Sequence, residues 1–470
     1  MSQHLKSSMK NILFVVGFLL LASHVLGASP APVPDFTKGG KKADTPDWNL
    51  GPTGAKGWVF ARGFDTSEAR QILITEVEKG SPAEGMLSTD DVILGLNGKA
   101  FASDARVALG QAIAEAEKDA NQGLLKLVCW RKGEQKEVTV RLKVMGSYSQ
   151  TSPYTCPKAQ LIVERGCRAI MKRGLAADEG SLRPEQNWTP LIQSSLEALA
   201  LLASGNPDYL NAVKQYAHKL APPEMKLRLR GENEGLDTWL WGYANLFLTE
   251  YYLATKDEYV LPAIRELARK IAIGQSEVGT WGHGFVVPRN QGNLGGYGAI
   301  NQPGLICWMS LVLAQKCGID DPEVQKAVAT SRRFFSFYTG KGSIPYGDHS
   351  PYRIQHDDNG KSGSAAVTFD LLGDASAAQF FSRMATAAYG EKELGHTGNY
   401  FGFLWGALGA NRAGPEAVAA YMKELRWYYE MARRWDGSFF TTRRDNYDWD
   451  MTGLFVLHYA LPLQKLCITG

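Results

Sequence analysis

Six residues in the C-terminal two-thirds of the sequence could do acid–base chemistry. They occur as neighbouring or nearly neighbouring pairs, each in a polar stretch between apolar runs. Two carboxylates can act as general acid and as base or nucleophile in glycoside hydrolysis, and His with Tyr can take and return a proton. The candidate catalytic residues are Asp348, His349, His396, Tyr400, Asp448 and Asp450.

Other polar and aromatic residues in the same stretches could bind a substrate. These are Trp281, His283, Asn293, Tyr352, Arg353, His356 and Asn399. The alternative to substrate binding is a structural role: the aromatic side chains could seal a core, and the polar segment 346–358 could be a solvated loop. The spacing of His349 and His356 matches no common metal-ligand pattern. We therefore expect neither a metal nor a cofactor.

The elements that position these residues are predicted to be helices. From Pro157 onward the apolar residues recur with a helical period, as Trp239, Tyr243 and Leu246 do. The pattern predicts twelve helices, near 158–174, 190–204, 207–220, 238–255, 257–273, 301–316, 321–338, 361–373, 375–389, 397–410, 414–432 and 448–463. Twelve helices make six hairpins.

The connections between these helices alternate in length. Those after even-numbered helices are short turns, and those after odd-numbered helices are mostly long, polar and aromatic. If the hairpins close into a ring, all long connections lie on one face. The sequence therefore predicts a mainly α fold, an (α/α)6 toroid over residues 157–470. His283, His349 and His396 should share one face, and Asp348 and His349 should approach Tyr400 and Asp450.

One turn of this region resembles a known repeat. Gln275-Ser-Glu-Val-Gly-Thr-Trp281 follows a helix and resembles the QW repeat of squalene-cyclase and protein-prenyltransferase toroids. Gly-Ser turns at 178–182, 340–344 and 435–439 are similar to degenerate copies. Terpenoid cyclisation requires an acidic D-x-D-D run, and Asp448-Trp-Asp-Met451 lacks its final acid. The resemblance therefore implies the fold, with a terpenoid cyclase as a third functional hypothesis.

The region before the helices, residues 53–145, resembles a bacterial PDZ domain. It has strand-like runs in the expected order, a Ser-Pro-Ala turn, an Asn-Gly turn and an Ala-rich helix. The resemblance implies a small α+β domain that binds a C-terminal peptide tail. The carboxylate-binding loop would comprise Lys56, Gly57, Trp58, Val59 and Phe60. The alternative is a PDZ-like fold that only packs on its neighbour.

The N-terminus has the pattern of an export signal. Lys6 and Lys10 precede a short apolar run, and small residues follow. We expect a signal peptide over 1–27, a tether over 28–52, a linker over 146–156 and a periplasmic or secreted protein; an uncleaved anchor is the alternative. No other stretch is long and apolar enough to span a membrane.

Composition narrows the functional classes. The chain has 470 residues with a formal net charge of +3 and no basic run interleaved with aromatics, so we expect no nucleic-acid partner. Its six cysteines show no zinc spacing. Most are expected to be buried thiols, with Cys307–Cys317 or Cys156–Cys167 left open as bridges.

Two functional hypotheses are favoured over a terpenoid cyclase. The first is an enzyme, a hydrolase or a lyase, that acts on an extracellular or cell-wall polysaccharide. The second is a non-catalytic envelope scaffold or binding protein. The order of signal peptide, PDZ-like domain and toroid also resembles exported bacterial proteins of unassigned function.

Overall fold

A computed structural model describes residues 32–63, 65–175, 189–231, 235–287, 293–351, 360–394, 400–442 and 448–470. Met1–Lys41 and Lys42–Gly470 are separate units. Within the first, the short helix η1 (Phe36–Lys38) is capped by the Asp35 side chain, which accepts from the backbone N–H of Thr37. The second unit is mainly α, with one large sheet before the helices. No helix of the described residues is both long and apolar enough to cross a membrane.

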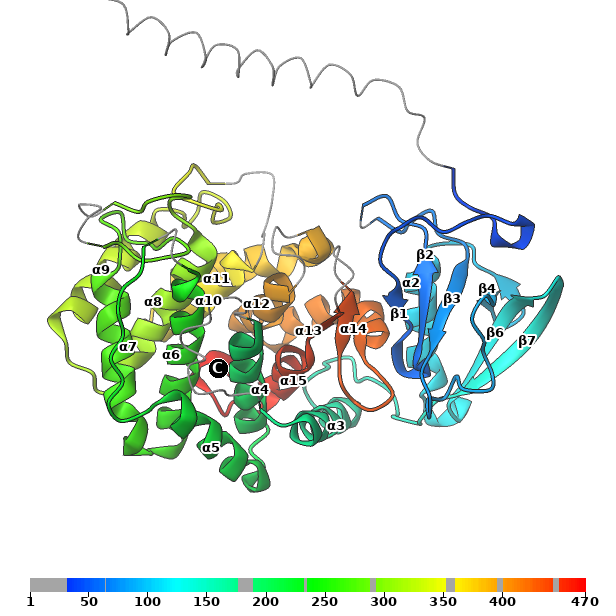
Figure 1. Cartoon of the computed structure of the whole chain (residues 1–470), viewed down its shortest axis with the longest axis horizontal. Coiled ribbons are helices and arrows are strands. Elements are labelled where there is room, and N and C mark those ends of the chain that lie inside the picture. The colour runs from blue at the N-terminus through cyan, green and yellow to red at the C-terminus, as the bar shows by residue number, and fades with distance from the viewer. Residues whose placement is uncertain are drawn as a thin grey trace, which may run out of the picture. The chain divides into compact units, whose positions relative to one another are not determined.

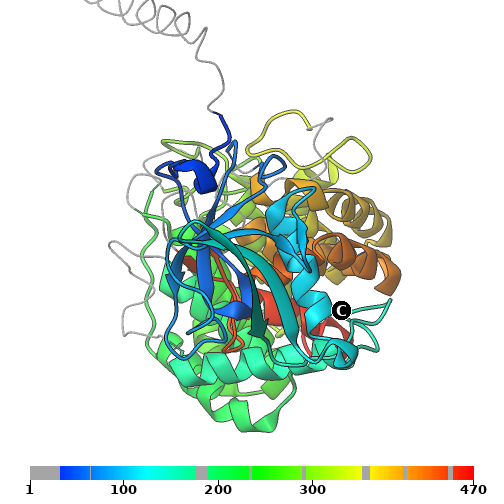
Figure 2. The same cartoon turned by 90° about the vertical axis from the view of Figure 1, so that its right-hand side faces the viewer.

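The sheet is antiparallel and lies beside a single α-helix, α2 (Ala105–Ala116). Its order is β1-β2-β3-β4-β6-β7, with β5 paired to β4. The strands are β1 (Trp48–Asn49), β2 (Ala55–Val59), β3 (Ile72–Val77), β4 (Val92–Leu96), β5 (Lys99–Ala100), β6 (Leu124–Arg131) and β7 (Glu134–Arg141). We call this region the sheet part. Figure 2 shows it in front of the helices.

Local sequence signals explain how the sheet part folds. Asn97 and Gly98 both have positive φ and join β4 to β5, with Leu96 opposite Lys99, as an Asn-Gly hairpin turn requires. Asp104 caps α2, because its side chain accepts from the backbone N–H groups of Arg106 and Val107. The predicted Asn-Gly turn and Ala-rich helix are both present.

Each of the twelve predicted helices has a counterpart in the part of the chain after Cys156, which we call the helical part (Figure 1). The helices are α3 (Pro157–Arg173), α4 (Thr189–Ala203), α5 (Leu210–Leu220), α6 (Asp237–Thr255), α7 (Leu261–Ile273), α8 (Asn301–Lys316), α9 (Pro322–Ser336), α10 (Lys361–Leu371), α11 (Ala375–Ala387), α12 (Tyr400–Ala410), α13 (Pro415–Glu424), α14 (Arg426–Ala432) and α15 (Thr452–Ala460). The predicted helix over 414–432 is divided into α13 and α14 at Leu425.

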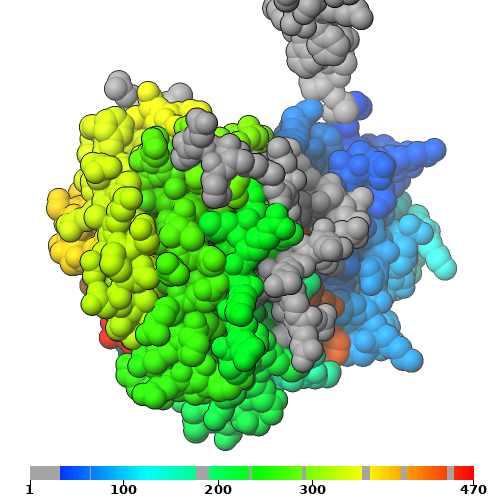
Figure 3. All heavy atoms as spheres, turned by 60° about the vertical axis from the view of Figure 1, so that its left-hand side comes forward, coloured from blue at the N-terminus to red at the C-terminus, as the bar shows by residue number. Residues whose placement is uncertain are grey.

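Two kinds of helix alternate along the helical part. Helices such as α8 and α15 are apolar nearly all round and are buried, whereas α7 and α9 carry a charged face. The buried helices contact one another in the order α4, α6, α8, α10, α12 and α15, and α15 contacts α4. The segment coloured green to yellow, which includes α6 to α10, makes up much of the face shown in Figure 3.

Small residues permit the closest approach among the buried helices. A Cβ atom at Gly363 of α10 would lie 2.1 Å from the carbonyl oxygen of Trp405, and one at Gly409 of α12 would lie 2.4 Å from the Cα of Gly363. Any larger side chain at either position would force the two backbones apart.

The last predicted helix begins later than expected. Asp448–Asp450 forms strand β9, which pairs with β8 (Phe440–Thr442), and α15 begins only at Thr452. The side chain of Asp450 accepts from the backbone N–H of Thr452 at 2.8 Å. The prediction of a helix from 448 was therefore wrong, because these residues pair across a hairpin.

The helical and sheet parts meet where α14 packs on α2 (Figure 1). Arg106 of α2 lies over the rings of Trp48 and Trp427, 4.0 and 4.8 Å from their centroids. It also makes two hydrogen bonds of 2.8 Å with the carboxylate of Glu393. The guanidinium thus has both stacking and charged partners at this contact.

A buried ion network lies at the same contact. Lys158 Nζ of α3 is 2.8 Å from the carboxylate of Glu117 and 3.1 Å from that of Glu430. Arg433 also pairs with both carboxylates. Two cations and two carboxylates therefore balance one another, and the loss of either cation would leave buried charge uncompensated.

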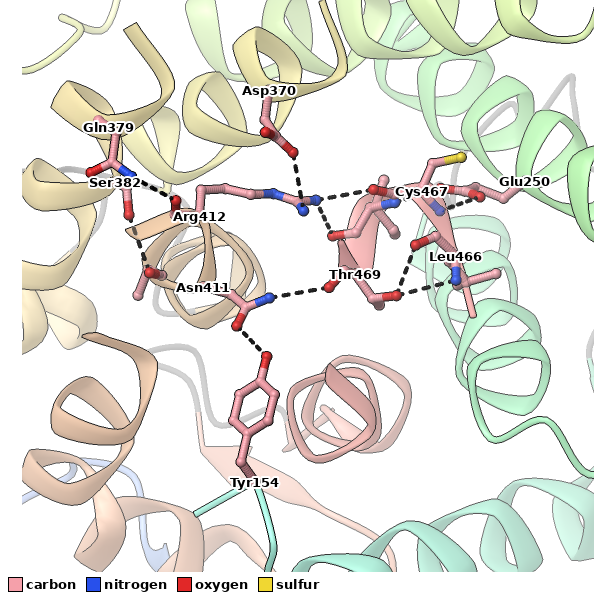
Figure 4. Close-up of polar contacts among 12 residues, drawn as sticks. Tyr154, Glu250, Asp370, Gln379, Ser382, Asn411, Arg412, Leu466, Cys467 and Thr469 are labelled. Atoms are coloured by element: carbon pink, nitrogen blue, oxygen red, sulfur yellow. Dashed lines mark hydrogen bonds and ion pairs between the residues drawn. The ribbon is translucent and has the colours of Figure 1, made fainter. Parts of the chain in front are cut away.

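The C-terminal segment is fixed inside the helical part (Figure 4). Glu250 of α6 accepts from the backbone N–H groups of Cys467 and Ile468, at 3.0 and 2.7 Å. Arg412 donates to the carbonyl oxygens of the same two residues, at 3.1 and 2.8 Å. Ile468 and Thr469 are fully buried. Ile468 and Thr469 are thus part of the core.

All six cysteines are free thiols, so neither of the two bridges left open in the sequence is formed. Five are buried, and Cys467 is half-buried. The expectation of buried thiols is confirmed for those five.

Candidate functional site

Two buried carboxylates share one arginine in the helical part. Arg173 Nη2 lies 2.8 Å from Glu197 Oε1 and 2.7 Å from Asp450 Oδ2. Burial and then the nearby charges of Asp450 and Glu197 raise the pKa of the Tyr400 hydroxyl. We call Arg173, Glu197, Tyr400 and Asp450 the carboxylate cluster.

Four separate elements bring the carboxylate cluster together. Arg173 is the last residue of α3, and Glu197 lies in the middle of the buried helix α4. Tyr400 is the first residue of α12, while Asp450 is the last residue of β9. Because α15 contacts both α3 and α4, the residues just before α15 lie beside these two helices.

Burial dominates the electrostatics of the carboxylate cluster. Glu197, Tyr400 and Asp450 are 2%, 5% and 8% exposed, whereas the Arg173 side chain is 32% exposed. Burial, reinforced by the charge of Asp450, raises the pKa of Glu197 to about 7. Burial also raises the pKa of Asp450, although Arg173 and the Thr452 hydrogen bonds act in the opposite direction. One arginine therefore does not fully compensate two carboxylates.

Aromatic rings lie beside the carboxylate cluster. The rings of Tyr400 and Trp449 meet edge to face with centroids 4.9 Å apart, and Tyr400 also contacts Phe401. Burial is the main reason that the pKa of Tyr400 lies well above its usual value. At neutral pH Tyr400 is thus a proton donor and not a phenolate.

This arrangement can hold and transfer a proton near neutral pH. A carboxyl group whose pKa is raised to about 7 can hold a proton near neutral pH, as a general acid requires. Since Glu197 and Asp450 each place an oxygen within 2.8 Å of the same nitrogen, these two oxygens are no further apart than the roughly 5.5 Å of a retaining glycosidase pair.

Of the six predicted catalytic residues, Tyr400 and Asp450 lie in the carboxylate cluster. Asp348 and His349 are exposed. They lie near Tyr338, which follows α9, because the Tyr338 hydroxyl donates to the His349 carbonyl at 3.2 Å. Burial, and then the charge of Asp348, raises the pKa of Tyr338. No contact among the described residues joins Asp348 or His349 to Tyr400 or Asp450.

His396 lies outside the described residues, as does the side chain of Asp448. The same holds for Tyr352, Arg353, His356 and Asn399 of the predicted substrate-binding set. Asn293 is exposed.

Trp281 and His283 have structural partners. The Trp281 ring is fully buried and donates from Nε1 to the Ile271 carbonyl at 2.9 Å, which agrees with the core-sealing alternative. His283 Nδ1 accepts from Trp239 Nε1 at 3.0 Å. The backbone of His283 lies at the start of α6, because its carbonyl accepts from the Thr238 hydroxyl.

Part of the segment 346–358 lies against the start of the buried helix α8. Asn301 Nδ2 donates to the carbonyl oxygens of Pro345 and Gly347, at 3.1 and 2.7 Å. The backbone N–H of Ile300, just before α8, donates to the carbonyl of Trp281. The connections that carry His283 and His349 therefore meet at the end where α6 and α8 begin.

The predicted peptide-binding residues form a strand and not a loop. Lys56, Gly57, Trp58 and Val59 are in β2, and Phe60 follows it. Both edges of β2 are paired, one with β3 and the other with β1, where Trp48 faces Gly57. The predicted loop is thus corrected to a strand, because its backbone groups pair with the chain's own strands.

Sequence reasoning missed Glu197 and Arg173. Glu197 is the one charged residue in Thr189–Ala203, a run that is otherwise uncharged and mostly apolar or small. A lone acid at such a position of a buried helix was a usable signal, since an unpaired buried charge is costly. Arg173 carried no signal of its own, because cations are common in the last turn of a helix.

The comparisons with known proteins bear on the helical part. A family model described as "Domain of unknown function (DUF6288)" matches residues 159–470. No curated protein and no solved structure matches the chain. The matched segment begins inside α3 and contains all four residues of the carboxylate cluster. Because it spans more than half of the sequence, the chain belongs to the DUF6288 family.

Proposed function

We propose that the protein is an exported enzyme that acts on an extracellular or cell-wall polysaccharide through the carboxylate cluster. The helical part would be an (α/α)6 toroid, and the contacts from α4 round to α15 and back to α4 support this. The sheet part would be a PDZ-like domain whose α2 and β2 are covered by the chain's own residues. One observation carries the proposal: Glu197 and Asp450 share Arg173 and have raised pKa values.

The roles follow from charge and proton state. Glu197, whose pKa is raised, would donate a proton to the glycosidic oxygen while the Asp450 carboxylate attacks the anomeric carbon as the leaving sugar departs. Water, deprotonated by Glu197, would then displace Asp450 and release the sugar. In a lyase, Arg173 would instead neutralise a uronate carboxylate and ionised Asp450 would remove the proton from the adjacent carbon. The C–O bond to the leaving sugar would break as the double bond forms, and Tyr400 would donate a proton to the leaving oxygen.

The experiment is a screen of neutral and acidic polysaccharides with three proteins: the parent, Glu197→Gln and Glu164→Gln. Glu164 is an exposed carboxylate of α3 that pairs with Arg168, so it is a matched control. Hydrolysis is measured as new reducing ends, and lyase action as ultraviolet absorbance of the unsaturated product. We expect Glu197→Gln to reduce turnover by about 10²–10⁴-fold and Glu164→Gln to leave it unchanged. Parent-level turnover by Glu197→Gln would refute this role.

A non-catalytic scaffold is the second candidate. It is favoured by the mutual pairing of the carboxylate cluster, since Arg173 binds both carboxylates and leaves neither without a cation. A scaffold should sediment with insoluble cell-wall polysaccharide, and Glu197→Gln should sediment equally well, with no turnover by either protein. Product release by the parent would exclude this candidate.

A further inference from the structure

A second site lies at the contact between the sheet and helical parts. A cavity of about 380 Å³ is lined by the turn after β3, the segment after β7, α3 and the turn that precedes β8. Its wall includes Ser81, Pro82, Lys143, Arg165 and Trp435. We call it the basic cavity. Its volume is within the usual range of small-molecule sites, about 300–1,000 Å³.

The basic cavity has an excess of positive charge. Arg433 also lines it, but its charge is balanced within the network of Lys158, Glu117 and Glu430. Lys143 and Arg165 have no carboxylate within ion-pair distance in the part of the chain that the structure describes. Burial and the charge of Arg433 lower the pKa of Arg165, with Glu117 and Asp436 opposing this. An anion beside Arg165 would relieve this repulsion.

Buried polar atoms around the basic cavity also lack partners. Ser81 Oγ, Glu117 Oε1, Arg165 Nε and Arg433 Nε have no hydrogen-bond partner in the described residues. Ser81, Glu117 and Arg433 are only 7%, 0% and 3% exposed. Buried polar groups are normally hydrogen-bonded. Three of the four atoms can donate and Glu117 Oε1 can only accept, so a complementary ligand carries both acceptor oxygens and hydroxyl groups.

An aromatic wall completes the basic cavity. The Trp435 indole is held by its Nε1, which donates to Glu78 Oε2 at 2.8 Å. It lies beside Gly80, where a Cβ atom would be 3.8 Å from the ring. Pro82 adds a second apolar surface on the lining. Flat apolar surfaces of this kind suit the apolar face of a ring.

We propose that the basic cavity binds a sugar acid. Its carboxylate lies on Arg165 and Lys143, its hydroxyl groups bond to Ser81 and Glu117, and its ring lies on Trp435. A neutral sugar lacks the anion, and a plain anion lacks the hydroxyl donor for Glu117. This site is separate from the carboxylate cluster, and its test measures binding and not turnover, so it can fail or succeed independently of the proposed enzyme activity.

The test is calorimetric titration of the full chain at low salt with glucuronate, glucose and a short peptide that has a free C-terminal carboxylate. Glucuronate should bind and glucose should not. Arg165→Gln should weaken glucuronate binding by about 10-fold or more, since it removes a charge-assisted contact. Lys143→Gln should weaken it by about 2–5-fold, because Lys143 is exposed. Lys126→Gln, which removes an exposed cation of β6 outside the cavity, should not change it.

Several results would overturn the proposal. They are no binding of glucuronate, equal binding of glucose, or parent-level binding by both Arg165→Gln and Lys143→Gln. Binding of the peptide without binding of glucuronate would overturn the sugar-acid assignment as well. Lys143→Gln decides the matter if Arg165→Gln fails to fold, because Lys143 is exposed and makes no described hydrogen bond.

Discussion

Replacing Glu197 by Gln should change how the stability of the protein depends on pH. In the unfolded chain Glu197 ionises near the ordinary glutamate pKa of 4.5, but in the folded protein its pKa is about 7. Between these values the folded state holds the extra proton, so the free energy of unfolding falls as pH rises. The stabilising contribution is complete below about pH 4.5 and is lost once pH passes about 7.

The size of this effect follows from the pKa shift. A rise from 4.5 to about 7 corresponds to roughly 3 kcal/mol, at about 1.4 kcal/mol for each pK unit. Gln is neutral and keeps an oxygen that can accept from Arg173, so the variant carries no such cost at high pH. Arg173 then compensates only one negative charge, that of Asp450. We expect Glu197→Gln to be more stable than the parent by about 1–3 kcal/mol at pH 8, and to differ little below pH 4.5.

The assay is urea unfolding of the parent, Glu197→Gln and Glu164→Gln across the range from about pH 4 to about pH 8. Glu250 also has a pKa raised to about 7 by burial, so part of the pH dependence should persist in Glu197→Gln. Glu164→Gln should follow the parent, because an exposed substitution changes stability by only about 0.5 kcal/mol. The reasoning fails if Glu197→Gln keeps the full pH dependence, or if it is less stable than the parent at pH 8.

Three further predictions concern the core. Arg412→Ala should lower the free energy of unfolding by about 2–5 kcal/mol in urea titrations, because it leaves buried carbonyls at the C-terminal segment unpaired, whereas exposed Lys423→Ala should change it little. Lys158→Met should lower the free energy of unfolding by about 3–5 kcal/mol, because it leaves two buried carboxylates with one cation fewer. The control is Lys172→Met, which replaces an exposed lysine of the same helix. Equal melting temperatures of the two variants would contradict the role of the ion network. A thiol reagent should label Cys467 first, since it is the only half-buried thiol of the six, although burial raises its pKa to about 11. Peptide mapping identifies the labelled cysteine, and earlier labelling of another cysteine would contradict the burial pattern.

The helices were predictable because their signal is local. Apolar periodicity, Pro near the starts of α7 and α9, and Gly turns can each be recognised within a short window of sequence. The β8–β9 hairpin was not, because Asp448-Trp-Asp450 also resembles a polar helix start, and only its pairing with Phe440–Thr442 makes it a strand.

The carboxylate cluster was predictable only in part, because it depends on contacts between distant elements. Tyr400 and Asp450 were predicted because polar residues just before an apolar helix are candidates for a functional site. Glu197 was overlooked because a charge within a helix usually faces solvent, and only the packing of α4 against α6 and α15 buries it. Nothing near Arg173 in the sequence indicates that its side chain reaches Asp450.

The buried C-terminal segment has a consequence for synthesis. Glu250 obtains its backbone donors from Cys467 and Ile468, and α15 contacts α4. A ribosome must therefore synthesise the chain through α15 before α4 and α15 can meet. Until then, apolar helices such as α8 have no complete set of neighbours, and the nascent chain depends on chaperones or on delayed folding. A stop codon before Cys467 would release a protein whose core lacks the buried residues Ile468 and Thr469.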